Sequence, residues 1–331
     1  MEKTVKGVGA AIGSVASTTL LAAASWIVYS RLKIRHDLDL PPALNAEREQ
    51  FGGGYAGMLS YYADRSGAGT PLLLLHSINA AASAYEVKPL FERFRGERPV
   101  FALELPGFGF SQRGERPYAP RVYANAIIGF LETQVEGPVD IVALSLSGEF
   151  AARAALERAS QVRSLALISP TGLSARPPQQ PNEGIFSAVS FPLWSQALFD
   201  LLTTRLSIRQ FLGMSFTGKL DEGMVDYSYT TAHQPGARFA PLAFISGKLH
   251  SPDIRAAVYE QLTQPALVLY DQDPYTSFEA LPDLLDRHDT WQARRIVPTR
   301  GLPHFDQPEQ TFEALAAFWS GLEGEGKQRT A

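Results

Sequence analysis

A serine lies at the junction of an apolar run and a helical pattern in the segment IVALSLSGEF, residues 141–150. A sharp turn from a strand into a helix brings the residues two before and two after Ser145 close together, so both must be small. Here they are Ala143 and Ser147. Such a turn lifts the hydroxyl above the edge of a sheet and brings the backbone N–H of Leu146 into the same space. The segment therefore predicts a nucleophilic serine, provided that a base reaches it.

Ser147 is a competing nucleophile, and helix capping is the structural role that Ser145 would have without chemistry. If Ser147 were the nucleophile, Glu149 would occupy a position that must be small. Glutamate is too large there, so the pattern favours Ser145.

Strands and helices alternate on either side of this segment. We predict strands at 71–77, 99–110, 139–145 and 162–172 and helices at 84–94, 121–134 and 147–159. Almost wholly apolar strands in this alternation are typical of βαβ units in a parallel sheet covered on both faces. The alternation stops near residue 175 and resumes near 251, with strands at 265–271 and 293–299 and a helix at 309–319.

These changes of pattern divide the chain into a core with an insertion. The predicted parts are a leader or membrane anchor (1–36), a linker (37–50), two core segments (51–174 and 251–322), a helical lid between them (175–250) and a polar tail (323–331). The lid is aromatic, and its aromatic side chains would either form its own core, which we favour, or line an apolar acyl pocket. They include Phe186, Phe191, Trp194, Phe199, Phe211 and Tyr229.

The stretch Gly7–Ser30 has no charged residue and is long enough for the roughly 20 residues of a membrane-spanning helix. A cleaved signal peptide and an amphipathic or disordered leader are alternatives. We favour a single-pass anchor, because the apolar run continues past the possible cleavage site. Two Lys/Arg residues precede the stretch and three follow it closely, which favours a cytoplasmic catalytic domain.

Composition narrows the choice of partners. The 331 residues are 45% hydrophobic with a net charge of −4, so no basic surface indicates nucleic acid. Cysteine is absent, which excludes a thiolate nucleophile and Cys-ligated zinc. We expect no cofactor and no metal, and a small-molecule acyl substrate as the partner besides the membrane.

The motifs around Ser145 resemble those of the α/β-hydrolase family, and the resemblance runs from about Phe51 to Trp319. LLLLHSINAAASAYE is similar to the family's strand and His-Gly oxyanion turn, with Ser77 in place of glycine. FALELPGFGFS is similar to its D-x-x-G-x-G-x-S segment, with Glu104 in the acidic position. The resemblance implies an α/β class, α/β-hydrolase fold: a mainly parallel eight-stranded sheet with helices on both faces and an inserted helical lid.

The same resemblance implies roles for individual residues. The backbone N–H groups of Ile78 and Leu146 would form the oxyanion hole, and His76 would shape the loop. The acid would follow the strand at 265–271. Asp273 fits the turn before the next proline better, and Asp271 stays an alternative; an Asx turn is the structural role open to either.

The base is implied less directly. The family ends in G-H-x-P-x-x-E-x-P-E, whereas this chain has TRGLPHFDQPE, and no residue fills the His position when LPHFDQPE is aligned. Of the six histidines, only His304 lies in the expected loop, so His304 is the predicted base. A surface or supporting histidine is the alternative role.

Ser145, Asp273 and His304 together predict a serine hydrolase of esters, lactones or related acyl compounds that works through an acyl-enzyme. The serine argues against epoxide hydrolases and haloalkane dehalogenases, which use an aspartate at this turn. A catalytically silent protein that binds a small apolar ligand is the alternative, and a cofactor-free perhydrolase is a further one.

Overall fold

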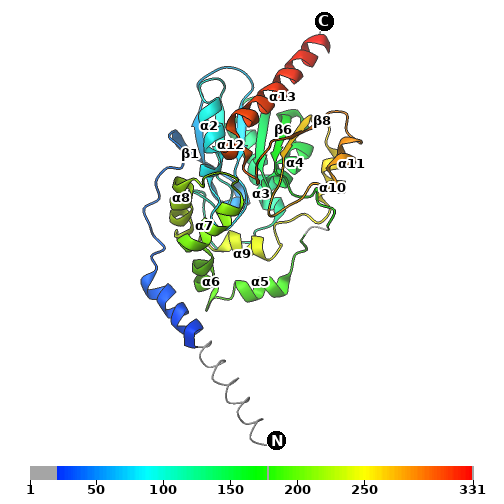
Figure 1. Cartoon of the computed structure of the whole chain (residues 1–331). Coiled ribbons are helices and arrows are strands. Elements are labelled where there is room, and N and C mark those ends of the chain that lie inside the picture. The colour runs from blue at the N-terminus through cyan, green and yellow to red at the C-terminus, as the bar shows by residue number, and fades with distance from the viewer. Residues whose placement is uncertain (1–20, 177–178, 330–331) are drawn as a thin grey trace, which may run out of the picture.

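A twisted sheet forms the centre of the protein in the computed structural model, which describes residues 21–176 and 179–329 (Figure 1). Its eight strands have the order β1-β2-β4-β3-β5-β6-β7-β8. The strands β3 to β8 are parallel, and β1 and β2 pair antiparallel at one edge. Their bounds are β1 Glu47–Gly52, β2 Met58–Asp64, β3 Leu72–Leu75, β4 Val100–Leu103, β5 Val139–Leu144, β6 Val162–Ile168, β7 Ala266–Tyr270 and β8 Trp291–Arg295.

The inner strands are apolar because both of their faces are covered. All residues of β3, β4 and β5 are buried, whereas β1 carries charged residues and is mostly exposed. Charges on an edge strand oppose further strand pairing, so the pattern fits the position of β1. The predicted α/β-hydrolase fold with a mainly parallel eight-stranded sheet is confirmed.

Helices pack against the two faces of the sheet and form two separate cores. On one face, α3 (Pro120–Gln134) and α4 (Ser147–Glu157) contribute Phe130 and Phe150 to the larger core. On the other face, α2 (Lys88–Phe94) and α13 (Pro308–Arg329) contribute Phe91 and Trp319 to the second core. Two short helices flank β8: α11 (Leu281–Leu285) and α12 (Pro303–Asp306).

Between β6 and β7 the chain makes a run of helices, of which α5 to α9 gather at one end of the molecule and α10 lies near α11 in Figure 1. They are α5 Glu183–Val189, α6 Ser195–Leu202, α7 Arg205–Met214, α8 Glu222–Ala232, α9 Phe239–Ile245 and α10 Ile254–Ala257. The aromatic stretch at 193–212 forms two helices, because Thr204 starts α7 by accepting a hydrogen bond from the Ser207 N–H. The lid and core boundaries given above stay predictions.

Residues 21–33 form a helix, here called the N-terminal helix, that lies against α6. Trp26 Nε1 donates to the Ala197 carbonyl at 2.7 Å, and Ser30 Oγ donates to Asp200 Oδ2 at 2.5 Å. Asp200 is buried, and its other oxygen lies 2.8 Å from His36 Nε2. Hydrogen bonds between residues that are 164 to 171 positions apart in the sequence therefore hold the N-terminal helix and the residues after it against α6.

The predicted single-pass membrane anchor is wrong. Within residues 21–176 and 179–329, no helix has the length and apolar character needed to cross a bilayer. The last ten residues of the predicted span, 21–30, belong to the N-terminal helix, which docks on α6, and residues 1–20 lie outside the described residues. The predictions of a membrane partner and of a cytoplasmic catalytic domain depended on that anchor, so they are withdrawn with it.

Candidate active site

Ser145 occupies the tight turn between β5 and α4. Its φ is +52°, and Ser169 is the only other non-glycine residue with a positive φ in the part of the chain that the structure describes. The Ser145 N–H donates to the Ile168 carbonyl at 2.8 Å, which ties the turn to β6. A left-handed conformation costs a residue with a Cβ about 1–2 kcal/mol. Strain of this kind persists where the surrounding structure enforces it, often at functional sites.

Ser147 has a different environment from Ser145. Its side chain is fully buried, and its hydroxyl donates to the Leu144 carbonyl at 2.7 Å. Ser145 is partly exposed. The Ser147 hydroxyl thus stabilises the turn and is not open to solvent.

Two backbone N–H groups near the turn are free. In residues 21–176 and 179–329, no hydrogen bond uses the N–H of Ile78 or of Leu146. Buried backbone donors are nearly always paired, so two free ones beside the partly exposed Ser145 can donate hydrogen bonds to a developing oxyanion.

Glu86 shapes the loop that carries Ile78. Its carboxylate accepts from the Ser77 N–H at 2.8 Å and from Asn79 Nδ2 at 2.7 Å, and burial raises its pKa. His76 accepts from the Leu105 N–H through Nε2, so its proton is on Nδ1, which donates to the Ser77 carbonyl. Burial lowers the pKa of His76 to about 4. His76 is therefore neutral, and both of its ring nitrogens are hydrogen-bonded. It supports the loop and has no free nitrogen to act as a base.

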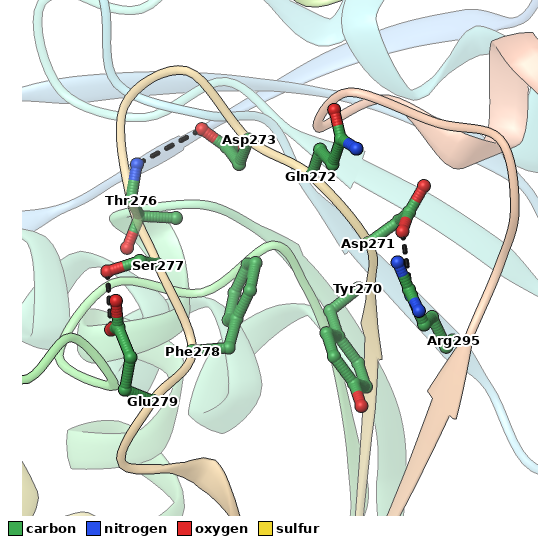
Figure 2. Close-up of a pocket in the computed structure, with 9 residues that line it drawn as sticks. All are labelled: Tyr270, Asp271, Gln272, Asp273, Thr276, Ser277, Phe278, Glu279 and Arg295. Atoms are coloured by element: carbon green, nitrogen blue, oxygen red, sulfur yellow. Dashed lines mark hydrogen bonds and ion pairs between the residues drawn. The ribbon is translucent and has the colours of Figure 1, made fainter.

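Asp273 lies in the loop after β7 (Figure 2). Because β5, β6 and β7 are parallel, this loop is at the same end of the sheet as Ser145. Asp273 Oδ1 accepts from the N–H groups of Tyr275 at 2.7 Å and Thr276 at 3.2 Å, an Asx turn. Burial raises the pKa of the Asp273 carboxyl to about 6, and those two N–H groups oppose the rise. The carboxylate adjoins a hollow of about 570 Å³. Its lining is drawn in Figure 2: Tyr270, Asp271, Gln272, Asp273, Thr276, Ser277, Phe278, Glu279 and Arg295.

Asp271, the alternative acid, is engaged elsewhere. Arg295 Nε donates to its Oδ1 at 2.8 Å, and the Thr299 N–H donates to its Oδ2 at 3.0 Å. Figure 2 shows the Asp271 carboxylate turned toward Arg295 and away from Asp273. Both oxygens hold the chain that leaves β8, which favours Asp273 as the acid.

Comparison with known proteins is consistent with this arrangement. A model of the alpha/beta hydrolase family matches residues 72–314. The chain belongs to this family.

Its relatives are distant. A 2-hydroxymuconate semialdehyde hydrolase of Pseudomonas sp. (strain CF600) is 29% identical over 111 residues, which are 33% of this chain and 39% of that protein. The chain spans less than two fifths of the length of the curated relatives it matches. Among solved structures, a probable hydrolytic enzyme from Pseudomonas aeruginosa PAO1 has a TM-score of 0.68 at 18% identity, covering 86% of this chain and 97% of its own. A serine hydrolase involved in carbazole degradation has a TM-score of 0.67 at 19% identity, with coverages of 83% and 98%. At these identities the likeness shows the fold alone.

Gly301 stands where the hydrolase family has its histidine. The chain keeps the motif's proline at Pro303 and its final Pro-Glu pair at 308–309, and the family's histidine precedes that first proline by two residues. The position is therefore filled by Gly301 and is not deleted, which corrects the alignment above. Gly301 has a φ of +107°, and a Cβ added to it would lie 2.7 Å from Asp273 Oδ2. Asp273 thus lies against this loop, but the loop offers it no imidazole.

Among the described residues, His304 makes no hydrogen bond to Ser145 or Asp273. It is fully buried in α12, and its Nε2 donates to the Glu86 carbonyl at 2.7 Å. Its Nδ1 has no partner among the described residues, and burial lowers the pKa of the ring to about 4. These contacts give no support to His304 as the base, because a base needs one nitrogen at the serine and the other at the acid. They make His304 a support for Glu86, and through it for the loop of Ile78.

Ser169, at the end of β6, was not singled out from the sequence. Its φ is +46°, and it is 2% exposed. Its Oγ is buried without a hydrogen-bond partner in the described part of the chain, which costs about 1–3 kcal/mol. The hydroxyl lies close enough to Asp273 to lower that carboxyl's pKa, although not in the geometry of a formed hydrogen bond. The sequence signal was weak: a serine before a proline in ISPTG reads as an ordinary strand exit.

The inserted helices close over the loop of Ile78. A hollow of only about 10 Å³ separates residues 80–82 from Thr231, Ala232 and Ala237. The aromatic side chains of this region differ in exposure: Phe199 is buried, whereas Phe191, Trp194 and Phe211 are exposed by 39–48%. Among the described residues, no three His, Asp or Glu side chains are grouped to hold a metal ion.

Proposed function

We propose that the chain is a serine hydrolase that attacks ester-like acyl substrates with Ser145. The observation that carries the proposal is the strained turn at Ser145, with φ +52°, beside the N–H groups of Ile78 and Leu146, which have no partner in the described residues. A turn that costs stability and exposes a hydroxyl next to two free donors suits acyl transfer.

The proposed reaction follows from these groups. The Ser145 oxygen adds to the substrate carbonyl, and the two N–H groups stabilise the negative oxygen that forms. One such donor is typically worth a factor of about 10²–10³ in rate. Collapse of the intermediate expels the alcohol and leaves an acyl-enzyme, which water hydrolyses. We assign Asp273 as the acid of the site and His304 to the support of Glu86.

The names of two similar proteins support hydrolysis. One is a semialdehyde hydrolase, and the other is a serine hydrolase involved in carbazole degradation. Neither name fixes the substrate of this chain, so the acyl class rests on the chemistry of the site.

A second candidate is a hydrolase-fold protein that binds a small apolar ligand without turnover. The specific observation in its favour is Gly301, which replaces the family's histidine while His304 donates to Glu86. A hydroxyl without any base is a poor nucleophile at neutral pH.

A fluorophosphonate probe separates the two candidates, because it modifies only activated serines. We expect labelling of the full-length chain at Ser145, no labelling of Ser145→Ala, and labelling of the matched control Ser147→Ala. p-Nitrophenyl esters of graded chain length then give the acyl preference. A folded wild-type protein that neither labels nor turns over any of these esters would contradict the hydrolase proposal and favour ligand binding. Labelling of Ser145→Ala would reassign the nucleophile.

A further inference from the structure

The two strained serines are neighbours on adjacent strands. The last residues in register between β5 and β6 are Leu144 and Ile168, so Ser145 and Ser169 follow at the same level. Adjacent strands lie about 4.8 Å apart, and the Ser145 N–H donates to the Ile168 carbonyl. Ser169 is itself fixed, because its N–H donates to the Leu269 carbonyl of β7 at 2.9 Å. Its backbone therefore lies between the turn of Ser145 and the strand that leads to Asp273.

The Ser169 side chain is unusual in two respects. Its hydroxyl is buried and has no hydrogen-bond partner among the described residues, and its backbone is left-handed. Both features oppose folding, and an unsatisfied buried group in a strained residue indicates a functional constraint. The hydroxyl lies near enough to the Asp273 carboxyl to lower its pKa, although no formed hydrogen bond joins them.

A serine hydroxyl can accept one proton while it gives up another, because it has one O–H and two lone pairs. Gly301 supplies no base, and His304 is committed to Glu86. We propose that Ser169 relays the proton of Ser145 to Asp273, a role that rests on the proposed hydrolase function. The three residues would then form a Ser-Ser-Asp relay in place of a triad with imidazole.

The steps balance without any further reactant. As the Ser145 oxygen bonds to the carbonyl carbon, its proton passes to Ser169, whose own proton passes to the Asp273 carboxylate. When the bond to the leaving alcohol breaks, the carboxyl returns a proton through Ser169 to the alcohol oxygen. Water then attacks the acyl-enzyme, and its proton passes through Ser169 to Asp273. The return of this proton to Ser145 frees the serine and releases the carboxylic acid product. Because the Ser169 hydroxyl makes no hydrogen bond among the described residues, its side chain must turn to reach Ser145 and Asp273 when the relay acts.

The carboxyl is suited to this role. Burial holds the pKa of Asp273 at about 6, so it is mostly ionised at neutral pH yet more basic than an exposed aspartate. The other titratable or charged groups around Asp273 are Tyr275, which is on the same loop, and three residues that line the same hollow: Asp271, Glu279 and Arg295.

The test is the rate of fluorophosphonate labelling of the full-length chain between about pH 5 and pH 9. We expect the wild-type rate to fall below about pH 6. Ser169→Ala should lower the rate at pH 7.5 by about 10² or more and abolish the fall at low pH. Ser169→Gly, which adopts a positive φ without strain, should behave in the same way and serves if the alanine variant folds poorly.

Ser164→Ala is the matched control, since Ser164 is also buried in β6 but its hydroxyl donates to Asp140. This variant should lose stability and keep the labelling rate and its pH profile. If Ser169→Ala and Ser169→Gly both label at the wild-type rate, the relay is overturned while the proposed hydrolase function stands. A lowered rate with an unchanged pH profile would likewise overturn the relay and make Ser169 merely structural. Absence of labelling in the folded wild type would overturn the proposed function and the relay with it.

Discussion

Changing Asp273 to asparagine is expected to stabilise the fold at neutral pH while it impairs the site. Burial raises the pKa of the carboxyl from 3.8 to about 6, so the folded chain holds this proton more tightly than the unfolded chain. One pKa unit corresponds to about 1.4 kcal/mol, which gives roughly 3 kcal/mol as the largest cost of the ionised form. The favourable contribution of the proton is complete below pH 3.8 and is lost as the pH rises through 6.

Urea unfolding of both proteins between about pH 4 and pH 8 measures this effect. The Asp273→Asn variant should match the wild type near pH 4 and exceed it by about 1–3 kcal/mol at pH 7 and above. Burial also raises the pKa of Glu104 and of Glu149 to about 7. Both groups titrate in the variant as in the wild type, so they cancel in the difference.

Asp271→Asn is the matched control, two residues away. It weakens the bonds from Arg295 and the Thr299 N–H, so it should destabilise the fold by about 1–3 kcal/mol. A stability difference between Asp273→Asn and the wild type that does not change with pH, or a variant that is less stable at pH 7, would refute the reasoning.

Three further changes test the contacts around the site. Gly301→Ala should lower the free energy of unfolding by about 1–3 kcal/mol, because φ is +107° and the new Cβ would press on Asp273; urea unfolding checks this. His304→Ala should lower it by about 2–4 kcal/mol through the lost bond to Glu86 and the cavity, yet leave Ser145 labelled; complete loss of labelling in a folded variant would restore His304 as the base. Asp200→Ala should release the N-terminal helix, seen as proteolysis there that is about tenfold faster; unchanged cleavage would contradict the docking.

The sheet was predictable because its signal is local. Apolar runs such as those of β3 and β5 are long enough to be read without their neighbours, and small residues around Ser145 indicate the turn directly. The buried role of His304 was not predictable in this way. Its partner Glu86 is 218 residues away in the sequence, and no pattern in the residues near His304 indicates that its ring is buried.

The N-terminal segment was misread for a related reason. An uncharged stretch satisfies the composition of a membrane helix, and nothing local shows that Ser30 meets Asp200. Ser169 was missed because its importance lies in a backbone angle and in an unpaired hydroxyl, neither of which has a sequence pattern.

The docking of the N-terminal helix has a consequence for the order in which the chain folds. Ser30 and Asp200 are 170 residues apart, so their bond closes one of the longest loops in the protein. At a synthesis rate of about 5–20 residues per second, the helix leaves the ribosome roughly 10–30 s before its docking site exists. During that interval Trp26 has no partner in α6, since Ala197 has not been made. The N-terminal helix therefore reaches its native place only after the inserted helices have been made, and it must stay undocked without aggregating until then.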